Sequence, residues 1–289
     1  MRLHIKLLLL LFLFMGYSCE KEGDDIINCP PFDNIQESPY KAPIWHPTDK
    51  IIGFNHIPLK EINYTYGIDC PQQAIYTYEE ELAGFYLIDE DGTNKRRILP
   101  YELNTPAWSP DGEWIAYDSN RDSPTGLYFI WKMKKNGDEK TRIAFAPNQG
   151  EARMPFWGND FNIVYQQYTD TSAEIFTMDS SGNAKTRLTS NKDRDFLPKY
   201  SPNKKLIGFI SQSQEFGNVE LWTINLSSNE KLKLTPEGCQ GFSWSPDGKL
   251  VYINYDYSRL DEKKGTLWIM NPDGSEKQQL THNDFRIIN

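Results

Sequence analysis

Short runs of alternating apolar and polar residues recur along most of the chain at a nearly constant spacing. Runs such as Phe85–Ile88, Leu221–Ile224 and Leu267–Met270 mix aromatic and aliphatic side chains, which is typical of half-buried β-strands. Five such runs each precede a turn pair, and these pairs are Asp91-Gly92, Asn136-Gly137, Ser181-Gly182, Ser227-Ser228 and Asp273-Gly274. The second residues of successive pairs lie 45 or 46 residues apart. This period predicts a tandem structural repeat.

A second motif occurs once per repeat and places an aromatic residue beside a turn-forming segment. Its copies are Ala42–Pro47, Thr105–Gly112, Met154–Asp160, Leu197–Asn203 and Phe242–Gly248. A short apolar run follows each copy, as in Trp114–Tyr117. Asp-Gly and Asn-Gly pairs supply the positive φ that tight hairpin turns need. Each repeat of about 45 residues therefore holds about four strands joined by hairpins.

Repeated four-stranded antiparallel sheets are typical of a β-propeller. We predict an all-β propeller with five sequence repeats, in which the Trp or Tyr of each first strand packs between neighbouring blades. Residues 282–288 look like the first strand of a sixth unit, and residues 26–41 would complete that blade. The blade count stays open between five blades and six with a composite closing blade.

The repeat resembles the PD40, or TolB-like, propeller repeat. The resemblance rests on Trp108–Gly112, on the strand after it, and on the closing segments Arg187–Thr189, Lys233–Thr235 and Gln279–Thr281. It covers about residues 42–281. The resemblance implies protein–protein binding at the cell envelope, with the partner docked on a propeller face.

The N-terminus is predicted to be a targeting segment. Arg2 and Lys6 precede an apolar run of about nine residues, which is too short to span a bilayer, since a helix needs roughly 20. Gly16–Cys19 resembles a lipobox of Bacteroidetes lipoproteins, and the acidic residues that follow resemble the surface-export tag of that group. We predict a signal peptide over 1–18, lipidation of Cys19, a tether over 19–41 and a propeller over 42–289. The alternative is a soluble secreted protein.

Charge and composition narrow the class of partner. The chain carries a formal net charge of −9, and removal of residues 1–18 makes it −11. An acidic protein of this kind is not a nucleic-acid binder, because phosphate neutralisation needs a basic face. Aromatic residues make up 13 % of the chain and supply the area for a core although the hydrophobic content is only 38 %.

Three cysteines remain beyond Cys19. An exported chain meets an oxidising space, and Cys29 and Cys70 flank the first repeat, so they are predicted to form a disulfide. Cys239 is then a lone thiol, expected half-buried in a Gly-rich turn. The Cys and His spacing excludes a structural zinc site.

The sequence predicts no catalytic residue, no metal ligand and no cofactor. The motifs of metalloproteases, serine hydrolases and phosphate-binding loops are all missing from it. His46 stands where other repeats have a turn serine, so we expect it to cap that turn. Asp111 and Asp247 are expected in turns as well.

An insertion in the first repeat is the irregular element. Tyr64, Tyr66, Tyr76 and Tyr78 surround Cys70, and exposed tyrosines suit glycans or a protein loop. The alternative is a longer outer hairpin stabilised by the Cys29–Cys70 bridge. Further binding candidates on the channel face are predicted in loops just before an inner strand; they are Arg153, Arg194 and Asp195.

Two functions follow as hypotheses. The first is a monomeric, non-catalytic scaffold for an envelope protein or glycan, which touches the outer membrane through its lipid anchor only and faces the periplasm or the surface. The second is a propeller enzyme similar to polysaccharide lyases, with a site at the central channel. That enzyme would need His46, His56 and His282 to converge on a metal.

Overall fold

A computed structural model describes residues 40–66, 71–144, 150–158, 160–170, 172–215, 217–254 and 265–281, without the side chains of 64–66 and 71–74. Two compact units result, the larger from Glu37–Glu61 with Thr77–Asn289, and the smaller from Met1–Gln36 with Ile62–Tyr76. Every strand of the repeat lies in the larger unit.

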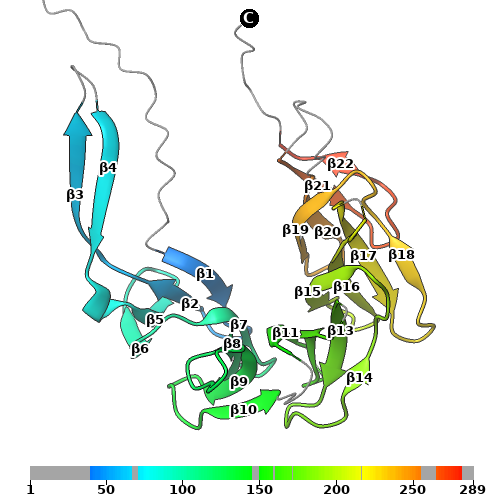
Figure 1. Ribbon diagram of the computed structural model, residues 1–289, viewed down its shortest axis with the longest axis horizontal. Coiled ribbons are helices and arrows are strands. Elements are labelled where there is room, and N and C mark those ends of the chain that lie inside the picture. The colour runs from blue at the N-terminus through cyan, green and yellow to red at the C-terminus, as the bar shows by residue number, and fades with distance from the viewer. Residues whose placement is uncertain are drawn as a thin grey trace, which may run out of the picture. The chain divides into compact units, whose positions relative to one another are not determined.

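The larger unit contains five four-stranded antiparallel sheets (Figure 1). Within each sheet the strands pair in chain order. The only helical segment in the described ranges is the short 3₁₀ turn η1, Glu80–Leu82. The prediction of an all-β propeller of four-stranded antiparallel blades is therefore confirmed, with five blades. Residues 26–39 and 282–289, to which a composite sixth blade was assigned, lie outside the described residues.

Each blade has the same four strands. The first strands are β1 (Tyr40–Trp45), β7 (Asn104–Trp108), β11 (Ala152–Trp157), β15 (Arg194–Tyr200) and β19 (Cys239–Trp244). The second are β2 (Ile51–His56), β8 (Trp114–Ser119), β12 (Ile163–Tyr168), β16 (Leu206–Gln212) and β20 (Leu250–Asn254). The third are β5 (Gly84–Asp89), β9 (Phe129–Lys134), β13 (Ala173–Met178), β17 (Val219–Asn225) and β21 (Thr266–Met270). The fourth are β6 (Arg96–Leu99), β10 (Thr141–Ala144), β14 (Thr186–Arg187), β18 (Lys231–Lys233) and β22 (Gln278–Gln279).

The insertion of the first repeat forms a two-stranded sheet. It consists of β3 (Leu59–Tyr66) and β4 (Pro71–Tyr78), which lie in sequence between the second and third strands of blade 1. An added hairpin at this position leaves the order of the blade's own strands unchanged.

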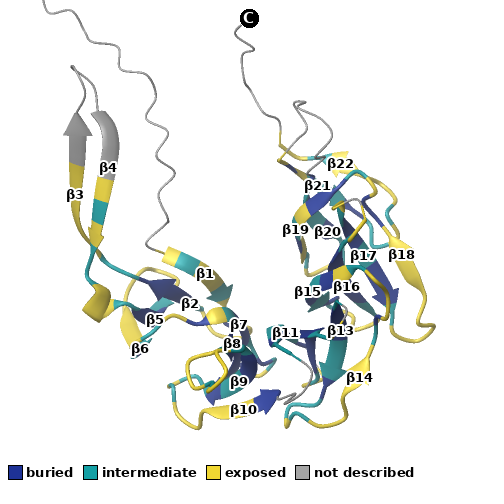
Figure 2. Cartoon of the chain, viewed as in Figure 1, coloured by how far each residue is buried: buried dark blue, intermediate teal, exposed yellow. Residues whose placement is uncertain are grey.

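The core lies between consecutive blades, and both faces of the second strands of blades 1 to 4 are largely buried, whereas buried and half-buried residues alternate in β20 (Figure 2). In blade 2, Ile115 packs with residues of blade 1, whereas its neighbour Ala116 packs with residues of blade 3. Successive side chains of a strand point to opposite faces, so a strand between two blades needs apolar residues at both. This explains the nearly continuous apolar runs after each turn motif.

Two glycines of the third-to-fourth strand turns, Gly137 and Gly182, have a second role besides their positive φ. Gly182 has φ +88, and a Cβ placed there would lie 1.9 Å from the carbonyl oxygen of Ile143 in the preceding blade. A Cβ at Gly137 would meet the carbonyl oxygen of Ile98 at 3.2 Å. In blade 4 the turn is one residue longer, because Asn229 donates to the carbonyl of Asn225 and takes the positive φ. The turns of blades 2 and 3 therefore contact the preceding blade.

Candidate binding site on the first strands

In blades 1 to 4 the Xaa-Pro dipeptide that ends two residues before the first-strand aromatic residue forms a β-bulge. The pairing of the first and second strands shifts register at this point in these four blades, and in blade 5 it shifts earlier, between Cys239 and Gly241. In four blades the residue before proline has a positive φ, between 42° and 54°; these residues are Ala42, Thr105, Met154 and Leu197. Such a conformation costs on the order of 1 to 3 kcal/mol at a non-glycine residue and is typical of functional sites.

The five first strands and the turns after them line a cavity of about 580 Å³. Every blade contributes to its wall, and the four prolines that follow the bulge residues are part of it; they are Pro43, Pro106, Pro155 and Pro198. The volume lies within the range of small-ligand sites, roughly 300 to 1,000 Å³. The bulges thus turn a repeated local motif into one shared cavity.

Aromatic side chains supply much of the wall and differ in exposure. Trp157 and Tyr200 are buried between blades, as the sequence predicted for all five positions. Trp45 differs, because 62 % of its surface is exposed. Trp108 and Trp244 are half-buried. The cavity therefore offers exposed and half-buried indole surface to a ligand, and the packing prediction for Trp45 is wrong, since its side chain stays largely uncovered.

Lys199 is the one charged residue among the described residues that line the cavity. Its Nζ donates to the carbonyl oxygen of Phe242 at 2.9 Å and lies 5.4 Å from the centroid of the Phe242 ring. Burial lowers the pKa of the Lys199 ammonium. Sequence reasoning missed this residue, although lysine stands there where the aligned positions of the other repeats hold uncharged residues.

The turns at the rim are built by side chains that cap the backbone. Ser109 Oγ donates to Asp111 Oδ1 at 2.6 Å and accepts from the backbone N–H of Trp114 at 2.9 Å. His46 takes the serine position, and its Nδ1 accepts from the backbone N–H of Asp49 at 3.0 Å. Nε2 therefore carries the hydrogen and donates to the Gly112 carbonyl, 2.9 Å away. The turn-capping prediction for His46 and Asp111 is confirmed.

Arg153, Arg194 and Asp195 lie in the first strands rather than in the loops before them, because pairing with the second strands begins earlier than the sequence indicated. Arg153 ion-pairs with Asp118 at 3.4 Å and lies near Glu151. Arg194 donates to the hydroxyl of Tyr168 at 2.6 Å. The side chains of Arg153 and Arg194 thus form contacts with other residues of the propeller.

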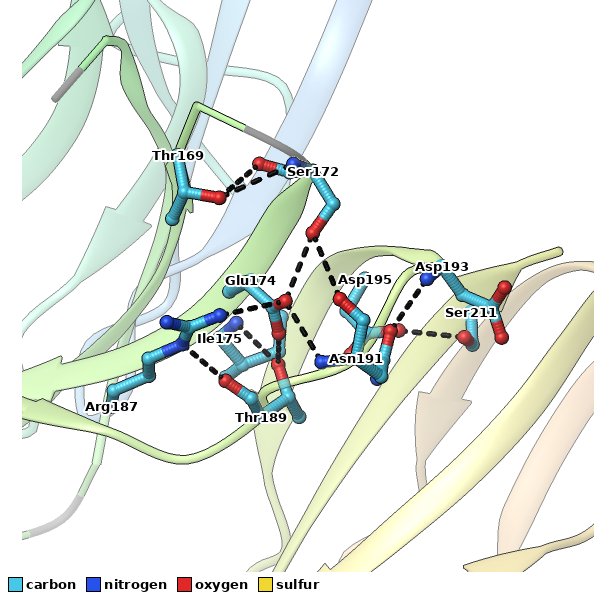
Figure 3. A network of polar contacts seen from close by, with 10 residues as sticks. All are labelled: Thr169, Ser172, Glu174, Ile175, Arg187, Thr189, Asn191, Asp193, Asp195 and Ser211. Carbon is cyan, nitrogen blue, oxygen red and sulfur yellow. Dashed lines mark hydrogen bonds and ion pairs between the residues drawn. The ribbon is translucent and has the colours of Figure 1, made fainter. Parts of the chain in front are cut away.

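Asp195 is fully buried, and its carboxylate accepts hydrogen bonds from Ser211 at 2.6 Å and Asn191 at 2.9 Å. Burial raises the pKa of Asp195. Figure 3 shows this carboxylate on one side of a network that also contains Glu174.

Glu174 is fully buried in blade 3 and accepts four hydrogen bonds (Figure 3). The donors are Ser172, Arg187, Thr189 and the backbone N–H of Asn191. Thr189 Oγ1 also accepts from the backbone N–H of Ile175 at 2.9 Å. The closing Arg-Leu-Thr segment therefore joins the fourth strand to the third and to the loop that enters blade 4.

The other predicted residues have varied placements. Tyr76 and Tyr78 lie half-buried in β4, and Tyr64 and Tyr66 belong to β3, where their side chains lie outside the described part. His56 is buried, and its ring stacks on Tyr40 with 4.2 Å between centroids. The remaining residues, Cys19, Cys29, Cys70 and His282, lie outside the described ranges.

Cys239 corrects one expectation. It begins strand β19 and is fully buried, because it packs in the core between blades 4 and 5 instead of in a half-exposed turn. Burial raises the pKa of its thiol to about 12. The thiol is therefore not activated as a nucleophile.

The family described as the TolB beta propeller domain (PD40) matches residues 105–289. The chain belongs to this TolB propeller family. The match begins at Thr105 in blade 2, and blade 1 has the same strand order as the other four.

Relatives and solved structures agree with this assignment. A TolB homolog of Chlorobium chlorochromatii is 29 % identical over 128 residues, which are 44 % of this chain and 28 % of that protein. The Tol-Pal system protein TolB of Francisella tularensis is 28 % identical over 174 residues, 57 % of this chain and 39 % of that protein. TolB from Acinetobacter baumannii has a TM-score of 0.63 at 19 % identity, over 85 % of this chain and 55 % of that one.

The chain thus matches well under half the length of these two relatives. An oligogalacturonate lyase in complex with manganese has a TM-score of 0.52 at 11 % identity, over 73 % of this chain and 62 % of that one. This likeness concerns the fold alone.

Two features are absent from the described part of this TolB-family chain. None of its helices is long and apolar enough to cross a membrane. In the same ranges, His, Cys, Asp and Glu side chains do not gather in threes in a way that would hold a metal ion.

Proposed function

We propose that this chain is a non-catalytic docking propeller of the cell envelope, and that a protein partner binds in the first-strand cavity. The cavity itself carries the proposal, because all five blades contribute to it and its wall is rich in proline and tryptophan. Tryptophan anchors dominate the energetics of protein interfaces. Trp45 has 62 % of its surface exposed and is therefore available as such an anchor.

The lining favours a protein over a glycan. A ligand with many hydroxyl groups needs several convergent polar groups to orient it, whereas Lys199 is the only charged side chain among the described lining residues. The hydroxyls of Ser109 and Ser201 are already bonded within their turns. A largely apolar wall suits the apolar side chains of a protein segment.

The names of the relatives support the same reading. Two of them are Tol-Pal system proteins, and the Francisella protein is one. Because of this similarity we propose that this chain also docks a protein at the envelope. We further propose that a lipid on Cys19 anchors it, because of the Gly16–Cys19 motif. Two acyl chains would hold it on a membrane, at about 0.8 kcal/mol per buried CH₂.

The lyase alternative has less support. Both ring nitrogens of His46 form hydrogen bonds with backbone groups and are therefore engaged within the fold. His56 is buried under Tyr40. The likeness to the lyase is one of fold only, and fold does not imply activity.

Replacing Trp45 with alanine is expected to reduce partner recovery at least about ten-fold, because a tryptophan that acts as a hot spot of an interface contributes roughly 2 kcal/mol or more. The tagged full chain is expressed in its host, cross-linked, and its co-purified proteins are quantified by mass spectrometry. Leu232→Ala is the matched control, since Leu232 is 43 % exposed on the fourth strand β18 and does not line the cavity. Equal recovery with Trp45→Ala and the control would refute docking in the cavity.

Replacing Cys19 with alanine is expected to abolish incorporation of an alkyne-labelled fatty acid and to release the protein from the membrane fraction. The acyl chains are the proposed source of membrane affinity. Cys29→Ala serves as the control and is expected to keep both label and membrane association. A wild-type chain that takes up no label would contradict the anchor.

A further inference from the structure

Lys199 has no anionic partner among the residues that the structure describes. Its printed contacts are both with Phe242, one to the carbonyl oxygen and one to the ring. Its neighbours on the cavity wall are Pro198, Tyr200 and the Trp244 indole, which donates to the Lys199 carbonyl at 3.2 Å. The ammonium is thus held against uncharged groups.

A charge in such a setting is costly. A desolvated ammonium loses its hydration, and one neutral acceptor with one ring face replaces only part of it. The cost falls when a carboxylate enters the same low-dielectric space and forms a hydrogen-bonded ion pair. A cavity with a single unpaired cation and apolar walls therefore selects a ligand with one anionic group among apolar ones.

We infer that the occupant of the cavity is a partner-protein segment that presents an aspartate or glutamate to Lys199, flanked by apolar or aromatic side chains that pack on the tryptophans. This inference rests on the proposed function and adds the chemistry of the partner. Lys199 is then the specificity-determining residue, and the Trp45 indole supplies apolar contact area.

The charge of the rest of the protein sharpens the inference. With a net charge of −9 the chain repels acidic polypeptides at long range, so it would not attract them through its overall field. Selection of a carboxylate must then come from the local cation in the cavity. An acidic segment that is not flanked by apolar residues is not expected to bind.

The test uses phage-displayed random heptapeptides selected on the immobilised full chain. The wild-type protein is expected to enrich peptides with Asp or Glu next to an aromatic residue. Lys199→Met keeps the aliphatic stem, removes the ammonium, and is expected to lose the acidic preference. Lys199→Arg, which keeps the charge, is expected to retain it.

The strongest wild-type peptide is then synthesised with blocked ends, beside its Asp→Asn or Glu→Gln analogue, and titrated by calorimetry. We expect the amide analogue to bind the wild type at least about ten-fold more weakly, and to bind Lys199→Met within two-fold of the acidic peptide. Equal affinities of the two peptides for the wild type would overturn the inference, as would a selection with no acidic preference.

A parallel selection on Trp45→Ala separates two failures. If Trp45→Ala binds no peptide while wild type and Lys199→Met bind the same neutral peptides, docking in the cavity stands and the carboxylate inference fails. If Trp45→Ala selects the same peptides as the wild type, Trp45 does not take part in binding, and the proposed docking in the cavity fails. Circular dichroism melting of each variant excludes unfolding as the cause of lost binding.

Discussion

Replacing Gly182 with alanine is expected to lower the free energy of unfolding by about 3 kcal/mol. Its φ of +88 already disfavours an L side chain, and the new Cβ would lie 1.9 Å from the carbonyl oxygen of Ile143. A backbone oxygen cannot turn aside as a side chain would, so the turn must move away from the preceding blade. Chemical denaturation of the full chain measures the loss.

Gly248 provides the matched control. It has φ +89, but a Cβ there would meet nothing within 4 Å. Gly248→Ala therefore carries only the backbone penalty, about 1 kcal/mol. If both variants lose the same stability, the contact between the blade 3 turn and blade 2 contributes nothing, and the packing role assigned to Gly182 is wrong.

Replacing Glu174 with glutamine is expected to cost about 3 kcal/mol, although the two side chains have nearly the same shape. Four donors point at the buried carboxylate, and one amide NH₂ would turn two hydrogens toward groups that also donate. The Arg187 guanidinium would lose its ion pair at 3.0 Å. Thermal and urea unfolding measure the change.

The aligned residue in blade 4 tests whether burial sets the size of this effect. Glu220 accepts from Lys233 at 3.0 Å and from the Trp222 indole at 3.3 Å, and it retains some contact with solvent. Glu220→Gln is therefore expected to cost about 1 kcal/mol. A larger loss for Glu220→Gln than for Glu174→Gln would contradict the assignment.

The number of strands, the positions of the turns and the fold could be predicted from the sequence, because each depends on short-range geometry. Asp111 and Ser109 cap a turn only two residues apart, and the glycine of each turn pair supplies its positive φ locally. These local turn structures then recur in five repeats with a period of 45 or 46 residues. Family membership follows from the same motifs.

The residues of the candidate site could be predicted from the sequence only to a small extent. The prolines of the repeat are part of a turn motif in the sequence, and only the register shifts in the first strands place them on a cavity wall. Asp195 has the residue type of a binding group, yet hydrogen bonds from Asn191 and Ser211 enclose it. Whether a polar side chain faces a ligand or the core depends on the neighbours that the fold places around it, here from β16 and from the loop before β15.

The sequence by itself determined that this protein is a five-repeat β-propeller of the TolB kind, because alternation, turn chemistry and period are properties of contiguous residues. Only the tertiary structure decided that Lys199 stands alone in an apolar cavity, that Trp45 stays exposed while Trp157 is covered, and that Gly182 must lack a side chain. These facts depend on contacts between residues about 40 or more positions apart, such as Lys199 with Phe242 and His46 with Gly112. No local pattern encodes such contacts, since they arise when one blade packs against the next.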